Sequence, residues 1–539
     1  MIVRTNNKAC RALVDLKRDD KWVHNSIDGI YCYAAGRAFL KDDFMNNKDL
    51  VELFLRYKKL DFKLFIELMK QLNGNFAIIL KDDKGILASV DRIRSIPIFY
   101  GIKEDAFLIG DDAHSIKEKL RLNKINPHAV EEFLMSGYIS YDETLYYDLK
   151  QLQPGEALYF KIDKSESSEN VCTERYYIYW NKNKKHLSID ELLDAYDVVL
   201  SQAFKRLVRS IEGRKVIIPL SGGVDSRLIA SMFKKLNYKN VVCLSYGVSN
   251  NWETKISKKV AEKLGYDWIY VPYSRKKWHD VYRSQKWKEF FYSEDNLSSL
   301  PNINDWLAVR ELKRNRSISE DAVFVPGHTG DFISGGHLHY IFGEKKDGLT
   351  KEKLLISILR KHYSLWATML ENQEIKNHII NKLSKFFENL PLNSEEDIAC
   401  AYECWEWQER QAKFIINSVR TYDFWGYEWR VPLWDSEIMD FWSSVPYELK
   451  LEKKLYLSYL KERDQFHLFG EDLQRKRLQK KRFLGGRLKK FTEYFRDTSG
   501  FYGIYNYFVV TFLNMGRRNV NSILVKDYMR ALENYSLRR

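Results

Sequence analysis

One stretch near the middle of the chain, residues 215–235, constrains the fold most; it reads KVIIPLSGGVDSRLIASMFKK. Its first apolar run, Val216 to Leu220, is short and rich in β-branched residues, which predicts a buried strand. A Ser-Gly-Gly turn follows, and apolar residues then recur at helical spacing after Asp225, which predicts a helix. Glycines before a helix N-terminus let backbone N–H groups approach an anion, so this stretch predicts a phosphate-binding loop.

The spacing within this loop excludes two common phosphate loops, since it has neither G-x-x-x-x-G-K-[ST] nor G-x-G-x-x-G. S-G-G-V-D-S instead resembles the pyrophosphate loop of enzymes that adenylate a substrate and release pyrophosphate (PPi). The structural alternative is a plain turn of serine and glycine. The resemblance implies ATP as a substrate, held by Ser221, Gly222, Gly223, Val224, Asp225 and Ser226.

The overall composition excludes fewer classes of protein than the loop sequence does. A chain of 539 residues suggests two or three domains. The net charge of +14 suits nucleic acid, an anionic membrane surface, an acidic substrate or merely a solvated basic face. Six scattered cysteines show no metal-binding spacing and fit a reducing compartment. We find neither a signal peptide nor an apolar run of about 18 residues, and so expect a cytoplasmic protein.

The pattern before the loop predicts an α+β domain over residues 1–165, with many antiparallel strands. Phe76 to Leu80 and Ile86 to Val90 read as strands around a turn, and residues 48–70 read as a single helix. A polar linker follows, and a capping-box pattern at Ser188 predicts a long helix that leads into the central strand.

Strands and helices alternate after the loop, which predicts an α/β domain with a parallel sheet and helices on both faces over residues 186–460. Ligands bind such sheets beyond the carboxyl ends of the strands. The loop at 221–226, the segment 245–247 and the segment 326–331 all follow predicted strands, so we expect them to converge. Residues 461–539 predict a basic helical extension, either solvated or associated with an anionic polymer or membrane surface.

Two motifs in the first domain resemble the amino-terminal glutaminase domain of asparagine synthetases. They are G-N-F-A-I-I-L at 74–80 and V-D-R-I-R-S-I-P-I-F-Y at 90–100. E-E-F-L-M-S-G-Y-I and L-Q-P-G-E-A-L are then similar to that family's lead into its synthetase domain. With the motifs below, the resemblance spans roughly residues 70–460.

The resemblance fails at the residues on which glutaminase chemistry depends. That family uses an N-terminal cysteine exposed by removal of Met1, whereas position 2 here is Ile2. Cys10 cannot become the N-terminal residue by that route, and Cys32 replaces an asparagine of the family. The arginine-bearing loop that grips glutamine has no clear counterpart. We therefore expect a degenerate glutaminase fold that covers the synthetase site or binds a partner.

The segment P-G-H-T-G-D-F-I-S-G-G-H (326–337) resembles the family's S-G-E-G-x-D-E-x-F-G-G-Y. The match implies that Gly327 contacts the nucleotide and that Asp331 joins Asp225 as a ligand of Mg²⁺. Asp225 could instead simply cap its helix. His328 replaces a glutamate implicated in handling the amine's proton, and could act as a base or line a different pocket.

Other site residues follow from the same resemblance. The family holds adenine with backbone groups at the segment that corresponds to Ser245, Tyr246 and Gly247. Glu253 could be a ligand or an acidic residue at a helix start. The motif V-P-Y-E-L-K leads in the family to an essential lysine, which we assign to Lys454, with Lys453 as the alternative register.

The motif W-G-Y-E-W-R-V-P-L-W-D (425–435) resembles the family's L-E-V-R-V-P-F-L-D. Its matching residues are expected to form a buried, ion-paired scaffold near the site, a structural role more than a catalytic one. The matches are Glu428, Arg430, Val431, Pro432 and Asp435.

These features together predict an AMP- and PPi-forming amide synthetase with ATP and Mg²⁺. The nitrogen would come from ammonia, from an ammonia-supplying partner or from an amine of the substrate. We favour a saccharide carboxylate, a uronic acid, as the substrate, and expect no nucleic acid. The alternatives are a β-lactam or lasso-peptide cyclase, a tRNA-modifying pyrophosphate-loop enzyme and a non-catalytic scaffold.

Overall fold

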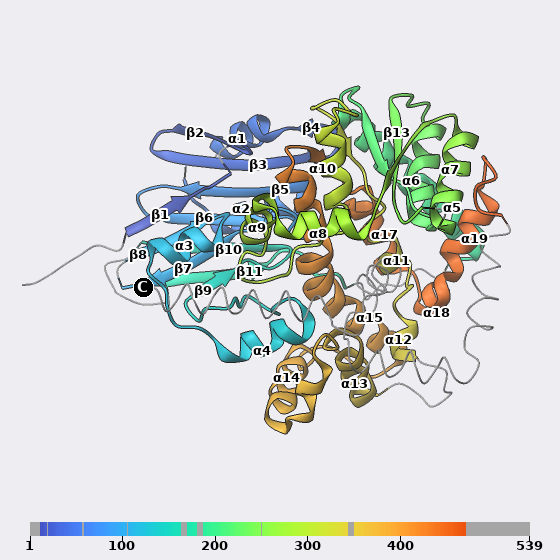
Figure 1. The fold of residues 1–539 in the computed structure, drawn as a ribbon. Helices are drawn as coiled ribbons and strands as arrows, with labels where there is room; N and C mark the ends of the chain where they lie inside the picture. The colour runs from blue at the N-terminus through green and yellow to red at the C-terminus, as the bar shows by residue number, and fades with distance from the viewer. Residues whose placement is uncertain are drawn as a thin grey trace, which may run out of the picture.

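A computed structural model describes residues 11–470 except 19, 57–58, 105, 163–169, 181–186, 250 and 343–349. Most of the predicted basic extension, together with Ile2 and Cys10, lies outside the described residues. Figure 1 shows a strand-rich N-terminal domain beside a parallel sheet with helices around it.

The N-terminal domain contains two sheets. The larger has the order β11-β10-β6-β5-β3-β2, with β4 paired to β3, and the smaller has the order β1-β8-β7-β9. The strands of the larger sheet are β2 (Trp22–Ile27), β3 (Ile30–Leu40), β4 (Asp43–Met45), β5 (Leu72–Lys81), β6 (Gly85–Val90), β10 (Glu156–Lys161) and β11 (Val171–Arg175). Those of the smaller sheet are β1 (Arg11–Asp15), β7 (Phe99–Lys103), β8 (Ala106–Gly110) and β9 (Leu149–Gln151).

Strand β5 shows why these sheets stack in layers. Side chains alternate between the two faces of a strand. Phe76, Ile78 and Leu80 pack under helices α1 (Asn47–Leu55) and α2 (Phe62–Gln71), while Ala77 and Ile79 pack toward the smaller sheet. Helices α3 (Ala113–Lys119) and α4 (Pro127–Ser136) share a core with β7 and β8 of the smaller sheet. The layers are therefore helix, sheet, sheet and helix.

The single helix predicted over residues 48–70 is wrong. Two helices occupy this segment, and each has its own cap. Asn46 and Asp49 form a capping box at the start of α1, and the Asp61 side chain accepts a hydrogen bond from the N–H of Leu64 at the start of α2. Asp61 therefore caps the start of a second helix, whereas the apolar pattern alone suggested that the first helix continued through this position.

The second domain is built on a five-stranded parallel sheet of order β14-β13-β12-β15-β16. Helices α6 and α7 lie on one side of it and α10 on the other (Figure 1), which confirms the predicted class. The strands are β12 (Val216–Pro219), β13 (Val241–Gly247), β14 (Asp267–Pro272), β15 (Val323–Phe324) and β16 (Glu428–Trp429). The helices are α5 (Ile189–Ile211), α6 (Val224–Lys235), α7 (Trp252–Leu264), α8 (Arg275–Arg283), α9 (Gln285–Glu294) and α10 (Trp306–Arg314).

The later part of the chain is helical, as predicted, with one irregularity. The helix that begins as α15 (Glu395–Glu406) continues as a π-helix, η3 (Trp407–Ile415), which contains several buried polar residues. The remaining helices are α11 (Gly330–Ile333), α12 (His339–Phe342), α13 (Lys351–His362), η2 (Ala367–Glu371), α14 (Gln373–Phe386), η4 (Ile416–Val419), α16 (Arg420–Phe424), η5 (Pro432–Trp434), α17 (Ser436–Ser444), α18 (Tyr447–Lys450), η6 (Leu451–Lys453) and α19 (Lys454–Glu462).

Asp435 fastens the two domains together. Its carboxylate receives two hydrogen bonds from the Arg206 guanidinium, at 2.9 and 3.0 Å, and one from Asn73 Nδ2 at 3.1 Å. Asn73 lies on β5 of the first domain, and Arg206 lies on α5 of the second. The Arg206 and Asp435 side chains are 8% and 10% exposed, so this is a buried ion pair.

We expect Asp435→Ala to lower the free energy of unfolding by about 3–5 kcal/mol, because it leaves the Arg206 charge buried without its main partner. Glu437→Ala is the matched control. Glu437 also contacts Arg206, at 2.7 Å, but its side chain is 46% exposed, so its loss should cost less than about 1 kcal/mol. Urea unfolding measures both values, and equal losses would contradict the assigned role of Asp435.

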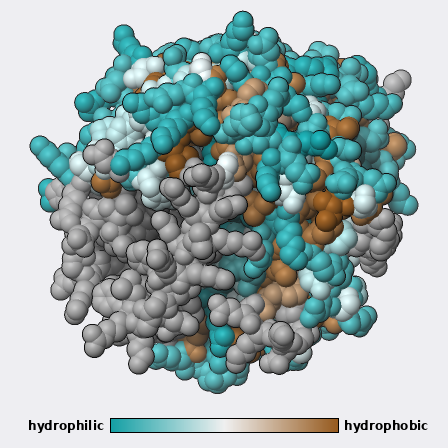
Figure 2. All heavy atoms as spheres, turned by 90° about the vertical axis from the view of Figure 1, so that its right-hand side faces the viewer, coloured by the Kyte–Doolittle hydropathy of each residue, from teal (hydrophilic) through white to brown (hydrophobic). Residues whose placement is uncertain are grey.

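Every helix among the described residues is too short or too polar to traverse a lipid bilayer. On the face in Figure 2, hydrophobic residues form small patches between hydrophilic ones. Scattered exposed apolar residues of this kind are normal for a folded domain.

Candidate active site

The loop between β12 and α6 has the geometry that its sequence predicts. Gly223 is the N-cap of α6 and offers no side-chain cap, so the first N–H groups of the helix are not satisfied by one. The serine hydroxyls shape the loop: Ser221 Oγ accepts from the N–H of Gly223 at 3.0 Å, and Ser226 Oγ accepts from the N–H of Ser221 at 3.1 Å. The backbone is therefore the main source of donors for an anion here.

Arg227, on the first turn of α6, is hydrogen-bonded to the backbone of this loop. Its guanidinium donates to the carbonyl oxygens of Gly222 and Gly223, at 3.0 and 3.2 Å, and to that of Leu468 at 2.8 Å. The side chain is buried. These hydrogen bonds fix the backbone carbonyl groups of the two loop glycines.

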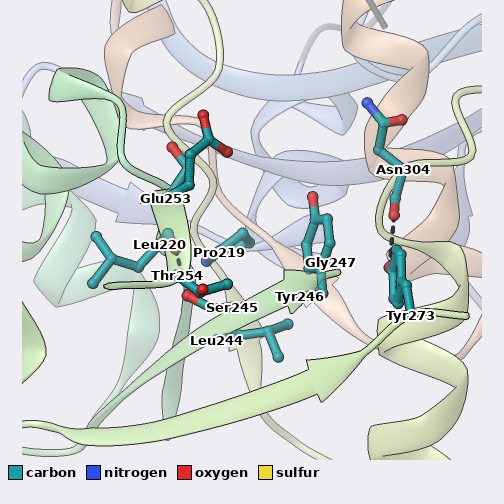
Figure 3. A pocket seen from close by; sticks show the side chains of 11 residues that line it. Pro219, Leu220, Leu244, Ser245, Tyr246, Gly247, Glu253, Thr254, Tyr273 and Asn304 are labelled. Carbon is teal, nitrogen blue, oxygen red and sulfur yellow. Dashed lines mark hydrogen bonds between the residues drawn. The ribbon is translucent and has the colours of Figure 1, made fainter. Parts of the chain in front are cut away.

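A cavity of about 100 Å³ lies beside the loop, at the carboxyl ends of β12 and β13 (Figure 3). It brings together the segments after two neighbouring strands, as predicted. Its lining residues are Pro219, Leu220, Ser221, Leu244, Ser245, Tyr246, Gly247, Glu253, Thr254, Tyr273 and Asn304. Glu253, for which two roles were open, thus lines the cavity from the start of α7.

Two aromatic rings give this cavity a flat, rigid wall. Tyr246 and Tyr273 stack with ring centroids 5.2 Å apart at an interplanar angle of 17°. The Tyr246 hydroxyl donates to Asp305, and that of Tyr273 donates to the carbonyl oxygen of Asn304 at 2.8 Å. A largely apolar cavity with a few fixed polar groups suits a planar heterocycle.

The predicted metal ligands come together at the other end of the loop. Lys453 Nζ lies 2.5 Å from Asp331 Oδ1 and 3.7 Å from Asp225 Oδ1, so one ammonium group bridges the two carboxylates. Burial alone would lower the pKa of Lys453, but the attraction of Asp225 and Asp331 outweighs it and raises the pKa above its ordinary value. The lysine is therefore fully charged at neutral pH.

Glycines allow the 326–337 segment to lie this close to the loop. A Cβ at Gly330 would come 2.4 Å from Asp225 Oδ1, and a Cβ at Gly327 would come 2.8 Å from the backbone nitrogen of Ser226. Neither position has room for a side chain. Gly327, predicted as a nucleotide contact, packs against the first turn of α6.

The structure places Lys453, not Lys454, at the carboxylates. Lys453 has a left-handed backbone, with φ of 62°, and this turn aims its side chain inward before α19 begins. Lys454 is exposed at the first position of that helix. The expected position was therefore wrong by one residue, because the sequence does not reveal the left-handed turn.

His328 lies in the 326–337 segment, three residues before Asp331, but does not contact the carboxylates of Asp225 and Asp331. Ser418 Oγ lies 3.2 Å from both ring nitrogens, and burial lowers the pKa of His328 below its ordinary value against the attraction of Asp305. The imidazole is therefore uncharged at neutral pH. An uncharged imidazole could act as a base or could simply line a pocket.

Tyr456 was missed by reasoning from the sequence. Its buried hydroxyl donates to Asp225 Oδ1 at 2.7 Å. It lies three residues after Lys453, one turn into α19, so both side chains reach Asp225 from the same helix start. The only signal in the sequence was the three-residue spacing between the lysine and the tyrosine. That spacing identifies Tyr456 only if Lys453, and not Lys454, is known to be the lysine at the site.

Asp225 and Asp331 supply the carboxylate oxygens that Mg²⁺ prefers, and that ion is commonly bound by one or two carboxylates together with substrate phosphates. The Lys453 ammonium shows that this position stabilises positive charge. Among the described residues, no group of three or more His, Cys, Asp or Glu could enclose a metal. The site therefore fits Mg²⁺ only in company with phosphate oxygens.

Comparison with known proteins agrees with this geometry. The "Asparagine synthase" family profile matches residues 195–476, and the "Glutamine amidotransferase domain" profile matches residues 30–177. Two similar proteins from Methanocaldococcus jannaschii are named "Putative asparagine synthetase [glutamine-hydrolyzing]" 2 and 1. The first is 25% identical over 54% of this chain and 55% of its own, and the second 22% identical over 64% and 58%.

A solved structure, the NH3-dependent NAD synthetase from Campylobacter jejuni, aligns over 41% of this chain and 94% of its own, at 14% identity and a TM-score of 0.20. This chain spans a little over half the length of the two Methanocaldococcus jannaschii relatives. The family profile covers more than half of the chain, including the loop, Asp331 and Lys453. The chain belongs to the asparagine synthase family.

Proposed function

We propose that this protein is an ATP-dependent amide synthetase that releases AMP and PPi, activating a substrate carboxylate by adenylation and transferring nitrogen to it. The observation that carries the proposal is Lys453 between Asp225 and Asp331, at the phosphate-binding loop. Two carboxylates, a lysine and a helix N-terminus without a side-chain cap suit a reaction in which phosphate charge must be held and released.

Each part of the site then has a role. The cavity beside Tyr246 takes the adenine base, and the backbone N–H groups in the first turn of α6 bind the β- and γ-phosphates. Mg²⁺, held by Asp225 and Asp331, would neutralise charge on the leaving pyrophosphate. Lys453 stabilises negative charge on the attacked phosphate and on the tetrahedral species formed when the nitrogen attacks.

The nitrogen is proposed to come from outside the chain's own N-terminal domain. Cys32 lies within β3, is buried, and has its thiol pKa raised by that burial, so it supplies no thiolate. A cavity of about 300 Å³ lies between the domains, lined by residues such as Gly36, Asn75 and Trp429. No cysteine is among the described residues that line it.

We expect the purified protein to release no glutamate from glutamine, because Cys32 is buried in β3 and burial raises its thiol pKa, so it cannot act as the thiolate nucleophile. Ammonia should support amide formation, whereas glutamine alone should not. An assay for glutamate measures this directly, with and without ATP. Glutamate release above background would contradict the proposal that the domain is degenerate.

The substrate is proposed to be a uronic acid of a saccharide. The net charge of +14 and the aromatic-rich helices suit an anionic, carbohydrate-like molecule. His328 in place of the family's glutamate favours a pocket tuned to something other than aspartate. ATP–PPi exchange with glucuronic acid and with aspartate tests this choice. Exchange with aspartate alone would contradict it, and exchange that depends on added tRNA would favour the RNA-modifying alternative.

A further inference from the structure

A second charged cluster lies near Asp331 and shares no residue with the lining of the nucleotide cavity. We call it the cationic cluster: His337, Lys361 and Arg410, gathered around the carboxylate of Glu406. His337 ends the segment that carries Asp331, Lys361 lies on α13, and Arg410 lies on the π-helix η3. Short π-helical stretches are frequent at functional sites. Neither the proposed phosphate-binding loop nor the nucleotide cavity uses these side chains.

The cluster has more positive than negative charge. Glu406 Oε1 lies 2.6 Å from His337 Nδ1, 3.4 Å from Arg410 Nη1 and 3.6 Å from Lys361 Nζ. Among the described residues, no other carboxylate forms an ion pair with these three side chains. Glu406 is fully buried, and its second oxygen, Oε2, has no hydrogen-bond partner in the described part of the chain. One carboxylate therefore serves the permanently charged Arg410, the lysine Lys361 and His337, whose pKa is lowered below its ordinary value by burial.

Lys361 is held with its ammonium group in a defined place. Nζ lies 3.7 Å from the centre of the Tyr340 ring and 3.1 Å from the Tyr402 hydroxyl. Burial lowers the pKa of Lys361 to about 7, against the attraction of Glu406. An anion bound beside this buried ammonium group would stabilise its charged form. Tyr340, which covers it, is 45% exposed, so the cluster borders solvent.

The cluster adjoins the reaction site through the end of the 326–337 segment. A Cβ at Gly336 would come 3.2 Å from Lys453 Cδ and 2.7 Å from the Asp331 carbonyl oxygen, and His337 is the next residue. The charge of Asp331 also acts on both Lys361 and Tyr340. A substrate whose carboxylate is activated beside Lys453 could therefore extend to the cluster.

We propose that the cationic cluster binds a second oxyanion, a carboxylate or a phosphoryl group, on the substrate whose first carboxylate is activated. This inference rests on the proposed function and narrows its substrate class to molecules with at least two anionic groups. Arginine and lysine together are well suited to oxyanions, since they supply several charge-assisted hydrogen bonds. Glu406 fixes their positions and leaves net positive charge for the ligand.

Three sugar acids with related skeletons test this proposal in the ATP–PPi exchange assay. Glucuronic acid has one carboxylate, glucaric acid has two, and glucuronic acid 1-phosphate adds a phosphoryl group. We expect kcat/KM to exceed that of glucuronic acid by about tenfold or more for at least one of the two dianionic compounds. The preferred one identifies the second anion as carboxylate or phosphoryl. Equal values for all three would overturn the proposal.

Lys361→Met and Arg410→Met should each remove most of that preference, with a loss of about tenfold to a hundredfold for the dianion and little change for glucuronic acid. Lys361→Arg should restore much of it. Arg360→Met is the matched control, because Arg360 is the exposed neighbour of Lys361 on α13. If the variants instead raise KM for ATP and keep the preference, the cluster serves the triphosphate and the proposal is wrong.

Calorimetric binding of the two dianions separates this inference from the proposed function, since it needs no turnover. Suppose that the dianions bind the native protein, that binding weakens in Lys361→Met, and that the native protein catalyses no ATP–PPi exchange. This result would support the cluster as an oxyanion site and count against adenylation. Exchange without any preference for a second anion would support adenylation and overturn the cluster. Thermal unfolding checks that each variant is folded. If Lys361→Met does not fold, Lys361→Arg is measured in its place.

Discussion

Lys453→Met is expected to reduce ATP–PPi exchange by about a hundredfold to a thousandfold, the range for removing one preorganised group that stabilises developing charge. Lys453 is the cation that joins Asp225 and Asp331, and its position depends on a left-handed turn at the start of α19. Methionine keeps the length and apolar stem of the side chain but removes its charge. The loss should fall mainly on kcat, since the charge develops in the transition state.

The adjacent lysine provides the control for this substitution. Lys454 is exposed at the first position of α19, so Lys454→Met should leave exchange within about twofold of the native rate. The pair therefore separates the two registers that the sequence left open. A large loss in Lys454→Met with an active Lys453→Met would show that the inward-facing lysine of this structure is not the functional one.

Asp225→Asn should also lower exchange by at least about a hundredfold, because the amide keeps the shape of the side chain but loses the charge that a metal requires. The Mg²⁺ concentration needed for half-maximal exchange should rise in the same variant. The fold should survive, since asparagine has the shape of aspartate and its amide oxygen can still accept the hydrogen bond from the Tyr456 hydroxyl. Circular dichroism and thermal unfolding check this point.

Asp321→Asn is the matched control, because Asp321 is an exposed carboxylate just before β15, at the opposite end of the strand from Asp331. It should leave both the rate and the Mg²⁺ dependence unchanged. Full exchange in Asp225→Asn at ordinary Mg²⁺ concentrations would refute the metal assignment and return Asp225 to the role of a helix-terminal residue.

Much of this site could be predicted from the sequence because its parts are local. The strand, the Gly-Gly turn and the helix of the loop are contiguous, so their geometry follows from their own residues. The convergence of Ser245, Gly327 and Asp331 on that loop follows from the rule for parallel sheets, since β13 and β15 both pair with β12.

The parts that could not be predicted depend on contacts between distant segments. The Tyr456 hydroxyl reaches Asp225 across 231 positions of sequence, and its direction depends on the left-handed turn at Lys453. Tyr273 and Asn304 join the nucleotide cavity only through tertiary packing. The π-helix over Trp407–Ile415 leaves no distinct periodic signal, although it sets the position of Arg410.

The identity of the nucleotide products tests the central proposal most directly. The protein should be incubated with ATP, Mg²⁺, ammonia and glucuronic acid 1-phosphate labelled with ¹⁸O in its carboxylate. If the carboxylate is adenylated, AMP and PPi form in equal amounts, and one labelled oxygen passes to AMP because the acyl–oxygen bond breaks when nitrogen attacks. Amide formed with ADP and inorganic phosphate, or with AMP that lacks the label, would contradict it.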